Sequence, residues 1–197
     1  MNWMKKVAVA LVCLLPLGLQ AAKVDTLQVK SPSMNKSIEV VVVSPDMAAT
    51  EACPVIYLLH GYGGNARTWV GIKPDLPKIA DEKGIFFVCP DGKNTWYWDS
   101  PLNADVRYET FISDELVKYV DSHYKTVADR KGRAITGLSM GGHGAMWNGL
   151  RHSDVFSAAG STSGGVDIRP FPKNWEMSVQ IGEKAKYPEN WEKYTVI

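Results

Sequence analysis

A serine stands between two glycines in the segment Gly137–Gly141, which reads Gly-Leu-Ser-Met-Gly and fits the pattern G-x-S-x-G. In this pattern the serine occupies a sharp, strained turn, and glycines two positions to either side avoid a collision. Residues 133–138 read as a short buried strand and residues 142–150 as the start of a helix. The pattern predicts acyl transfer with Ser139 as nucleophile and the backbone N–H of Met140 as an oxyanion donor. The alternative is a glycine-rich turn with an incidental serine.

A glycine-rich loop, His60–Asn65, follows an apolar run at 54–59 that is typical of a central parallel strand. Loops at the carboxyl ends of such strands build sites in α/β sheets. We expect the backbone N–H of Tyr62, or alternatively that of Gly63, to be the second oxyanion donor. No Gly-Lys-Ser/Thr follows, which argues against a phosphate loop, and a plain tight turn is the other interpretation. We expect His60 to be a structural hydrogen-bonding residue.

Two tryptophans, Trp96 and Trp98, lie in an aromatic segment that follows the next predicted strand. Aromatic side chains on a loop at this edge of a sheet could line a substrate pocket. Packing beneath the loop, as a satellite of the core, is an equal alternative. Further along, residues 108–124 show the periodicity of an amphipathic helix with His123 on its apolar stripe, so we expect this histidine to be packed.

The elements that must position these residues alternate between strand and helix after a first hairpin, which indicates an α/β protein with a mainly parallel sheet and helices on both faces. The stretch 164–197 mixes proline, tryptophan and charge, and we expect a loop or lid with short helices there. Gly84 ends one predicted helix. In order, we predict an antiparallel hairpin at 26–30 and 37–44, strands at 54–59, 85–89, 133–138 and 155–161, and helices at 76–83, 108–124 and 142–150.

The first residues predict export. Lys5 and Lys6 precede an apolar run, Val7–Leu19, and small residues follow it, so we interpret residues 1–22 as a signal peptide and residues 23–197 as one domain in a secreted or periplasmic protein. The run is short for a membrane span, so no stable anchor is expected after cleavage. The formal net charge of +1 gives no electrostatic indication of nucleic-acid binding. The sequence leaves the oligomeric state open.

Two cysteines, Cys53 and Cys89, lie beyond the predicted signal peptide. Cys53 precedes one predicted strand and Cys89 closes the next. If these strands are parallel neighbours, the two residues lie at opposite ends of the sheet, and a disulfide requires a Cα separation of only about 4.4–6.8 Å. We therefore expect two free, mostly buried thiols.

Five segments of the sequence share a further property: His60–Asn65, Trp96–Pro101, Arg107–Phe111, Gly137–Gly142 and Ser163–Asp167. Together they resemble the esterase D family of α/β-hydrolases, which includes S-formylglutathione hydrolases, tributyrin-type esterases and feruloyl and acetylxylan esterases. The resemblance implies an α/β-hydrolase fold, Ser139 as nucleophile, an oxyanion hole from Met140 and the Tyr62 region, and no metal or organic cofactor. An exported protein disfavours glutathione thioesters, so small acyl esters or acetyl and feruloyl groups on polysaccharides are the expected substrates.

The catalytic acid and base of such an enzyme are not recognisable. In α/β-hydrolases they follow the serine in the order acid, then histidine. After Ser139 the histidines are His143 and His152, on or just past the helix that leads away from the serine, where we expect packing or supporting roles. We expect Asp154 to be a loop residue and Asp167 a structural hydrogen-bonding residue. The chain therefore resembles the first two-thirds of an esterase, without the last strands and helix.

Two hypotheses follow from the residues. The first is an exported serine esterase that acts through an acyl-enzyme and is complete in a longer form. The second is a non-catalytic ligand-binding module or inactive remnant of the same fold, with the Trp96–Trp98 loop holding the ligand. Composition does not separate them.

Overall fold

The computed structural model describes residues 22–197. The predicted signal peptide, residues 1–22, therefore lies outside the described residues except for Ala22. The sequence-based domain beginning at residue 23 coincides with the start of the first strand. No helix among the described residues is long and apolar enough to cross a membrane.

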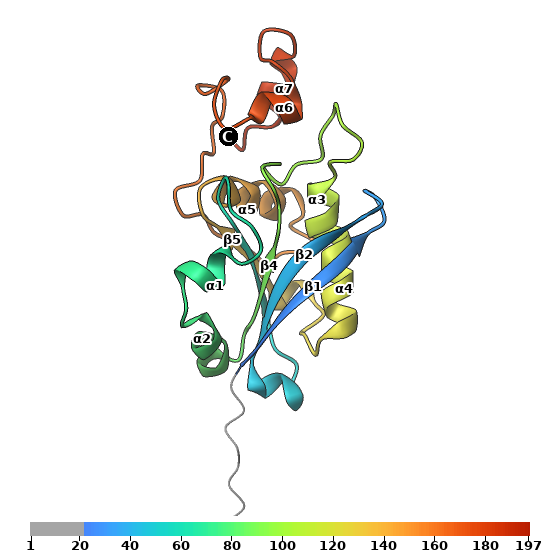
Figure 1. The fold of residues 1–197 in the computed structure, drawn as a ribbon, viewed down its shortest axis with the longest axis vertical. Coiled ribbons are helices and arrows are strands. Elements are labelled where there is room, and N and C mark those ends of the chain that lie inside the picture. Colours follow the sequence, from blue (N-terminus) through green and yellow to red (C-terminus); the bar gives the residue numbers. More distant parts are fainter. Residues whose placement is uncertain (1–21) are drawn as a thin grey trace, which may run out of the picture.

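Six strands form one sheet in the order β1-β2-β4-β3-β5-β6 (Figure 1). The hairpin β1–β2 is antiparallel, β2 runs antiparallel to β4, and the pairs β3–β4, β3–β5 and β5–β6 are parallel. The mainly parallel sheet and its leading hairpin confirm the predicted fold class. The strands are β1 (Lys23–Ser31), β2 (Lys36–Ser44), β3 (Val55–Leu59), β4 (Phe86–Pro90), β5 (Arg133–Gly137) and β6 (Ala158–Ala159).

Helices cover both faces of the sheet, and Figure 1 shows α1 and α2 on one side with α3 and α4 on the other. The predicted helix at 76–83 is confirmed, with Gly84 at φ +62° after its end, because glycine takes this left-handed conformation without strain. A turn of π-helix, Phe111–Glu115, joins α3 to α4. The helices are α1 (Thr68–Ile72), α2 (Leu76–Lys83), α3 (Tyr108–Thr110), α4 (Leu116–His123), α5 (Met140–Arg151), α6 (Met177–Ile181) and α7 (Pro188–Lys193), with short 3₁₀ turns at Asp46–Ala49 and Arg130–Gly132.

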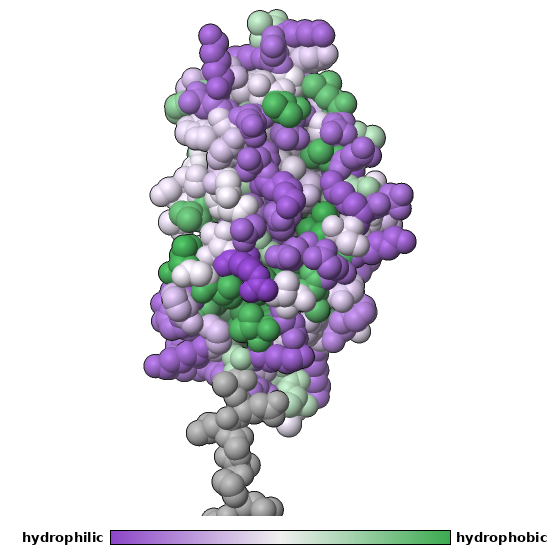
Figure 2. Space-filling model, in the orientation of Figure 1, coloured by the Kyte–Doolittle hydropathy of each residue, from purple (hydrophilic) through white to green (hydrophobic). Residues whose placement is uncertain are grey.

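Successive side chains of the central strands enter two separate cores, as expected for strands covered on both faces. Val41 and Val43 of β2 pack with α2, whereas Val40 and Val42 pack on the side of α3, α4 and α5. The core on the side of α3, α4 and α5 is the larger and contains most of the aromatic residues. In the view of Figure 2, hydrophilic residues cover most of the surface and hydrophobic residues form small separate groups.

Two local predictions are corrected. His123 is exposed at the last turn of α4, where its ring stacks on Tyr119 at a centroid distance of 4.0 Å, because the helix ends there and turns its last residue outward. The strand predicted at 155–161 contains only Ala158–Ala159, because a turn occupies the residues from His152 to Val155. The cysteine prediction is confirmed, since Cys53 and Cys89 are both free and buried.

The last part of the chain contains the short helices α6 and α7, in agreement with the predicted excursion at 164–197. These helices lie beyond the end of the sheet where β5 passes into α5 (Figure 1). They are anchored by a buried tryptophan, Trp191, whose indole N–H donates to the Gly182 carbonyl at 2.9 Å. The Tyr194 hydroxyl also donates to the Asp99 carbonyl at 2.8 Å, so this segment is fastened to the loop that follows β4.

Candidate active site

Ser139 lies at the turn between β5 and α5 with φ +55° and ψ −116°. A non-glycine residue in this region stores backbone strain and persists only where neighbouring contacts hold it. The Ser139 N–H donates to the Thr162 carbonyl at 2.8 Å, and the N–H of Leu138 donates to the Leu59 carbonyl at 3.1 Å. These bonds hold both sides of the turn against neighbouring strands and loops.

The glycines around Ser139 are required by close backbone approach. A methyl group at Gly141 would overlap the Leu59 carbonyl, and one at Gly137 would overlap the Gly141 carbonyl. The strand–turn–helix geometry predicted for this segment is therefore present. Its consequence is that the side chain of Ser139 is exposed at the carboxyl edge of the sheet.

The predicted oxyanion loop lies beside the serine. A methyl group built on Gly61 would come within 3.5 Å of the Ser139 Cβ. The loop is a tight turn in which the Gly64 N–H donates to the Gly61 carbonyl at 3.0 Å. Within residues 22–197, the N–H groups of Tyr62 and Met140 donate to no protein acceptor, so both are available to a ligand at the serine.

The prediction of Gly63 as the alternative oxyanion donor is corrected. Its N–H donates to the Asn94 side-chain oxygen at 2.8 Å and is therefore already engaged. Sequence reasoning does not single out Asn94, because no local pattern indicates that a half-buried amide at this position meets a loop 31 residues earlier.

His60 braces the base of the same loop. The Gly92 N–H donates to its Nε2 at 2.9 Å, so the proton resides on Nδ1, which donates to the Gly61 carbonyl at 2.7 Å. The Tyr97 hydroxyl donates to the His60 carbonyl at 3.0 Å. His60 is buried and both ring nitrogens are occupied, as the structural role predicted for it requires.

A cavity of about 390 Å³ opens beside Ser139. Aromatic side chains dominate its walls, and Asp167 is the one charged side chain among the described residues that line it. Hydrogen bonds from Arg169 lower the pKa of the Asp167 carboxyl to about 2, so this carboxylate is charged at neutral pH. The lining residues are Tyr62, Trp96, Ser139, Ser163, Gly164, Gly165, Asp167, Ile168, Phe171, Trp175 and Met177.

The two tryptophans of the predicted binding loop have different environments. Trp96 lines the cavity, and its indole N–H donates to the Trp175 carbonyl at 3.1 Å. Trp98 is wholly buried beneath it, with the two rings stacked at 5.5 Å, and does not line the cavity. The prediction of Trp98 as a substrate contact is therefore corrected, because it is a core residue. Of the two alternatives left open by the sequence, lining a pocket applies to Trp96 and packing beneath the loop applies to Trp98.

His143 is fully buried on α5. The Trp98 indole N–H donates to its Nε2 at 3.0 Å, so Nδ1 carries the proton and donates to the Gly165 carbonyl at 2.7 Å. Burial lowers the pKa of His143 to about 4, which keeps the imidazole neutral. The histidine connects α5, the loop after β4 and one wall of the cavity, and it offers no free nitrogen to Ser139.

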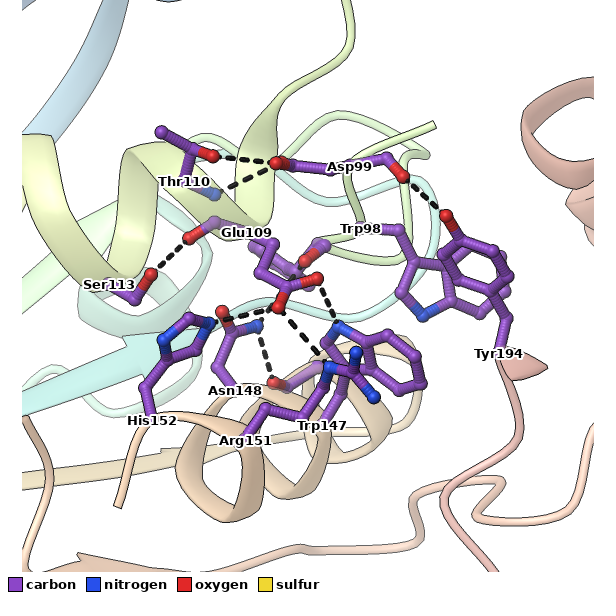
Figure 3. Close-up of polar contacts among 12 residues, drawn as sticks. Trp98, Asp99, Glu109, Thr110, Ser113, Trp147, Asn148, Arg151, His152 and Tyr194 are labelled. Atoms are coloured by element: carbon purple, nitrogen blue, oxygen red, sulfur yellow. Dashed lines mark hydrogen bonds and ion pairs between the residues drawn. The ribbon is translucent and has the colours of Figure 1, made fainter. Parts of the chain in front are cut away.

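The remaining histidine after the serine, His152, belongs to a cluster centred on Glu109 of α3 (Figure 3). Its Nε2 lies 2.9 Å from one Glu109 carboxylate oxygen, and the Trp147 indole N–H donates to the other oxygen at 2.8 Å. Arg151 also contacts this carboxylate, at 3.3 Å. The cluster fixes the far end of α5 to α3, and no sequence pattern indicates Glu109 as its centre.

The carboxylates after the serine are held locally. Asp154 is exposed in the turn after α5. Asp167 accepts hydrogen bonds from Arg169 and Thr195. Within residues 22–197, the Ser139 hydroxyl makes no hydrogen bond to a histidine or carboxylate, and no group of three or more His, Cys, Asp or Glu side chains is arranged to hold a metal ion.

The strand order, the strained serine at the strand-to-helix turn and the glycine loop beside it define an α/β-hydrolase. A sequence model of the family described as "Putative esterase" matches residues 31–195, and the chain belongs to this family.

The chain is 30% identical over 149 residues to an esterase of Mycobacterium tuberculosis, a match that covers 72% of this chain and 32% of the relative. It is 31% identical over 108 residues to an acetyl esterase of Caldicellulosiruptor saccharolyticus, covering 54% of this chain and 40% of that protein. The chain thus spans about a third to two-fifths of the length of these relatives.

Solved structures show the same fold. An S-formylglutathione hydrolase from Agrobacterium tumefaciens superposes with a TM-score of 0.75 at 22% identity, covering 89% of this chain and 69% of that one. A ferulic acid esterase superposes with a TM-score of 0.68 at 30% identity, covering 89% and 71%.

Proposed function

We propose that this protein is a serine carboxylic-ester hydrolase that acts through an acyl-enzyme on Ser139. The observation that carries the proposal is the exposed Ser139 at a strained strand-to-helix turn, beside a cavity of about 390 Å³ and two backbone N–H groups that have no acceptor among residues 22–197. Such donors, fixed before the reaction begins, stabilise the negative charge that develops on a carbonyl oxygen.

In the proposed reaction, the Ser139 oxygen attacks the acyl carbon and the carbonyl oxygen becomes an oxyanion held by the N–H groups of Tyr62 and Met140. Collapse of this intermediate breaks the bond to the alcohol, which leaves with a proton. Water then attacks the acyl-enzyme, releasing the acid and restoring the hydroxyl. The scheme uses no metal and no organic cofactor.

The proton of Ser139 must pass to a base, because a serine hydroxyl is a weak nucleophile by itself. The four described histidines are engaged elsewhere: His60 and His143 by two hydrogen bonds each, His152 by Glu109 and His123 by the Tyr119 carbonyl. We therefore assign the base to none of them.

The proposed substrates are small acyl esters, or acetyl and feruloyl esters of polysaccharides. The aromatic walls formed by Trp96, Phe171 and Trp175 suit an apolar or planar acyl group. The names of an acetyl esterase and a ferulic acid esterase among the similar proteins support the same range. We place the enzyme outside the cytoplasm because of the Lys5–Lys6 and Val7–Leu19 pattern.

The decisive experiment is labelling with a fluorophosphonate, followed by mass-spectrometric mapping of the modified residue. We expect modification at Ser139, and hydrolysis of p-nitrophenyl acetate or methyl ferulate that is lost in Ser139→Ala. Both the 197-residue chain and a form extended past Ile197 should be tested, because losing the base of a serine hydrolase lowers kcat by roughly 10⁶-fold.

The second candidate is a non-catalytic binding module that uses the aromatic cavity. It is favoured by the absence, within residues 22–197, of a histidine or carboxylate hydrogen-bonded to Ser139. Ligand-dependent fluorescence changes with no labelling of Ser139 in either form would support this candidate and contradict the esterase proposal.

A further inference from the structure

Asn94 joins the oxyanion loop to the aromatic wall of the cavity. Its side-chain oxygen accepts the Gly63 N–H at 2.8 Å, and its side-chain NH₂ donates to the Glu176 carboxylate at 3.3 Å. The side-chain NH₂ of Gln180 donates to the Asn94 backbone carbonyl at 3.4 Å. We propose that Asn94 is a positioning residue that fixes the orientation of the oxyanion loop and couples it to the wall that carries Trp175. This inference rests on the proposed esterase function.

The loop has two N–H groups that could face a substrate, and Asn94 selects between them. In the turn from Gly61 to Gly64, Gly63 has φ +76°, the value that a type II turn requires at its third residue. The peptide between the two central residues of a β-turn can adopt the type I or the type II orientation, and these place its N–H on opposite sides. By accepting the Gly63 N–H, Asn94 holds one orientation and leaves the Tyr62 N–H as the free donor.

The two ends of the amide are matched to different partners. Gly63 supplies a donor and needs an acceptor, whereas Glu176 supplies a carboxylate and needs a donor. An amide side chain satisfies both at once, and these demands also assign its oxygen and nitrogen. An aspartate at this position would keep the first contact and replace the second with a repulsion between like charges.

The wall contacted by Asn94 is strained. Trp175 and Glu176 have φ of +50° and +54°, and Lys93 and Trp96, on either side of Asn94 and Thr95, have φ of +49° and +61°. Non-glycine residues keep such conformations only where the surroundings over-determine them. The bonds from Asn94 to Glu176 and from Trp96 to the Trp175 carbonyl hold the two strained segments together. The wall and the oxyanion loop are thereby parts of one braced unit.

The test uses three variants and one matched control in the form of the protein that the labelling experiment identifies as reactive. Asn94→Ala removes both side-chain contacts, Asn94→Asp keeps the acceptor for Gly63, and Glu176→Ala removes the contact with the wall and leaves the one with Gly63. Asn174→Ala is the control, because Asn174 is an exposed asparagine on the same segment whose side chain makes no hydrogen bond within residues 22–197. The readouts are hydrogen exchange of the Gly63 amide, followed by NMR, and fluorophosphonate labelling separated into reagent affinity and inactivation rate.

We expect faster Gly63 exchange in Asn94→Ala, and wild-type exchange in Asn94→Asp, Glu176→Ala and the control. The inactivation rate should fall about 3- to 10-fold in Asn94→Ala, the effect of one lost neutral hydrogen bond. Glu176→Ala and Asn94→Asp should mainly weaken reagent affinity. A purely structural role would instead lower both parameters together with the thermal midpoint, without rescue by aspartate.

Unchanged Gly63 exchange in Asn94→Ala would overturn the inference, as would an equal loss of inactivation rate in Asn94→Ala and Asn94→Asp. The amide measurement needs no chemistry at Ser139. If no form of the protein is labelled, the proposed function fails, and Gly63 exchange still decides whether Asn94 fixes the loop.

Discussion

Ser139 has a backbone conformation that glycine adopts more easily than any other residue, with φ +55°. Removing its hydroxyl in two ways separates chemistry from strain. Ser139→Ala keeps the strain of a β-carbon, whereas Ser139→Gly relieves it. We expect both to abolish labelling, and the glycine variant to be more stable than the alanine variant by about 1 kcal/mol, the reverse of the usual order. Urea denaturation measures the difference in the free energy of unfolding. An alanine variant as stable as the glycine variant, or more stable, would show that the backbone at Ser139 is not strained.

The buried His143 predicts how stability depends on pH. Its pKa falls from 6.5 to about 4 on folding because of burial. The unfolded chain therefore binds more protons between these values, so the stability contributed by neutral His143 is complete above pH 6.5 and is lost as the pH falls toward 4. At about 1.4 kcal/mol per pH unit, the loss approaches 3 kcal/mol.

Denaturation curves between pH 7 and pH 4 test this expectation. The free energy of unfolding should fall less steeply in His143→Gln than in the wild type. An exposed control, His123→Gln, should keep the wild-type profile. Identical slopes in His143→Gln and the wild type would show that another group causes the acid sensitivity.

At this scale the sequence predicts the strained turn at Ser139 and Met140, because glycine spacing is a local signal. It does not distinguish Trp96 from Trp98. The two tryptophans are two residues apart in one loop, and the positive φ values of Trp96 and Tyr97 determine the direction in which each ring points. The partners of Asn94 and Glu109 depend on contacts between distant segments, which no local pattern encodes.

Among the elements, α5 must approach its neighbours closely. A β-carbon at Gly141 would overlap the Leu59 carbonyl, and one at Gly144 would overlap the Tyr97 ring. We expect Gly141→Ala to destabilise the protein by about 3 kcal/mol and to abolish labelling, since rigid backbone cannot yield. Gly144→Ala should destabilise the protein less, because the Tyr97 side chain can shift.

Gly71 provides the matched control, because a methyl group there meets no atom within 4 Å. In helix α1, Gly71→Ala should be neutral or stabilise by up to about 1 kcal/mol. Thermal unfolding of the three variants gives the ranking. A Gly141→Ala variant as stable as Gly71→Ala would mean that α5 packs less tightly against the end of β3 than described.

The boundaries of most helices and strands follow from the glycine and turn residues that end them. Gly84 ends α2 where predicted, and the turn at 32–35 joins the predicted hairpin. The first hairpin strand, Lys23–Ser31, is longer than the predicted 26–30. The strand after α5 was predicted too long, because an apolar run does not determine how many residues find a pairing partner. Only Ala158–Ala159 pair with β5 as a strand.

For the molecule as a whole, the sequence predicts processing of the amino terminus. Mass spectrometry of secreted or periplasmic protein should find a chain beginning at Ala22 or Lys23, because small residues follow Val7–Leu19. Lys5→Glu with Lys6→Glu should reduce export, since the positive segment is removed. A cytosolic protein that begins at Met1 would contradict this expectation.

The fold class was predictable at this scale because the order of hairpin, strands, glycine loop and serine turn is itself informative. No catalytic base was predictable, and each of the four described histidines is hydrogen-bonded to groups other than Ser139.

The stack of Trp96 on Trp98 gives the cavity an optical signature. Two indoles with centroids 5.5 Å apart and planes 21° apart are close enough for their electronic transitions to couple, and Trp175 lies 6.3 Å from the first. Trp96 lines the cavity while Trp98 is wholly buried, so a molecule entering beside Ser139 contacts one ring directly and changes the coupled signal of the pair. The near-ultraviolet circular dichroism of this protein should therefore report occupancy of the cavity without any added dye.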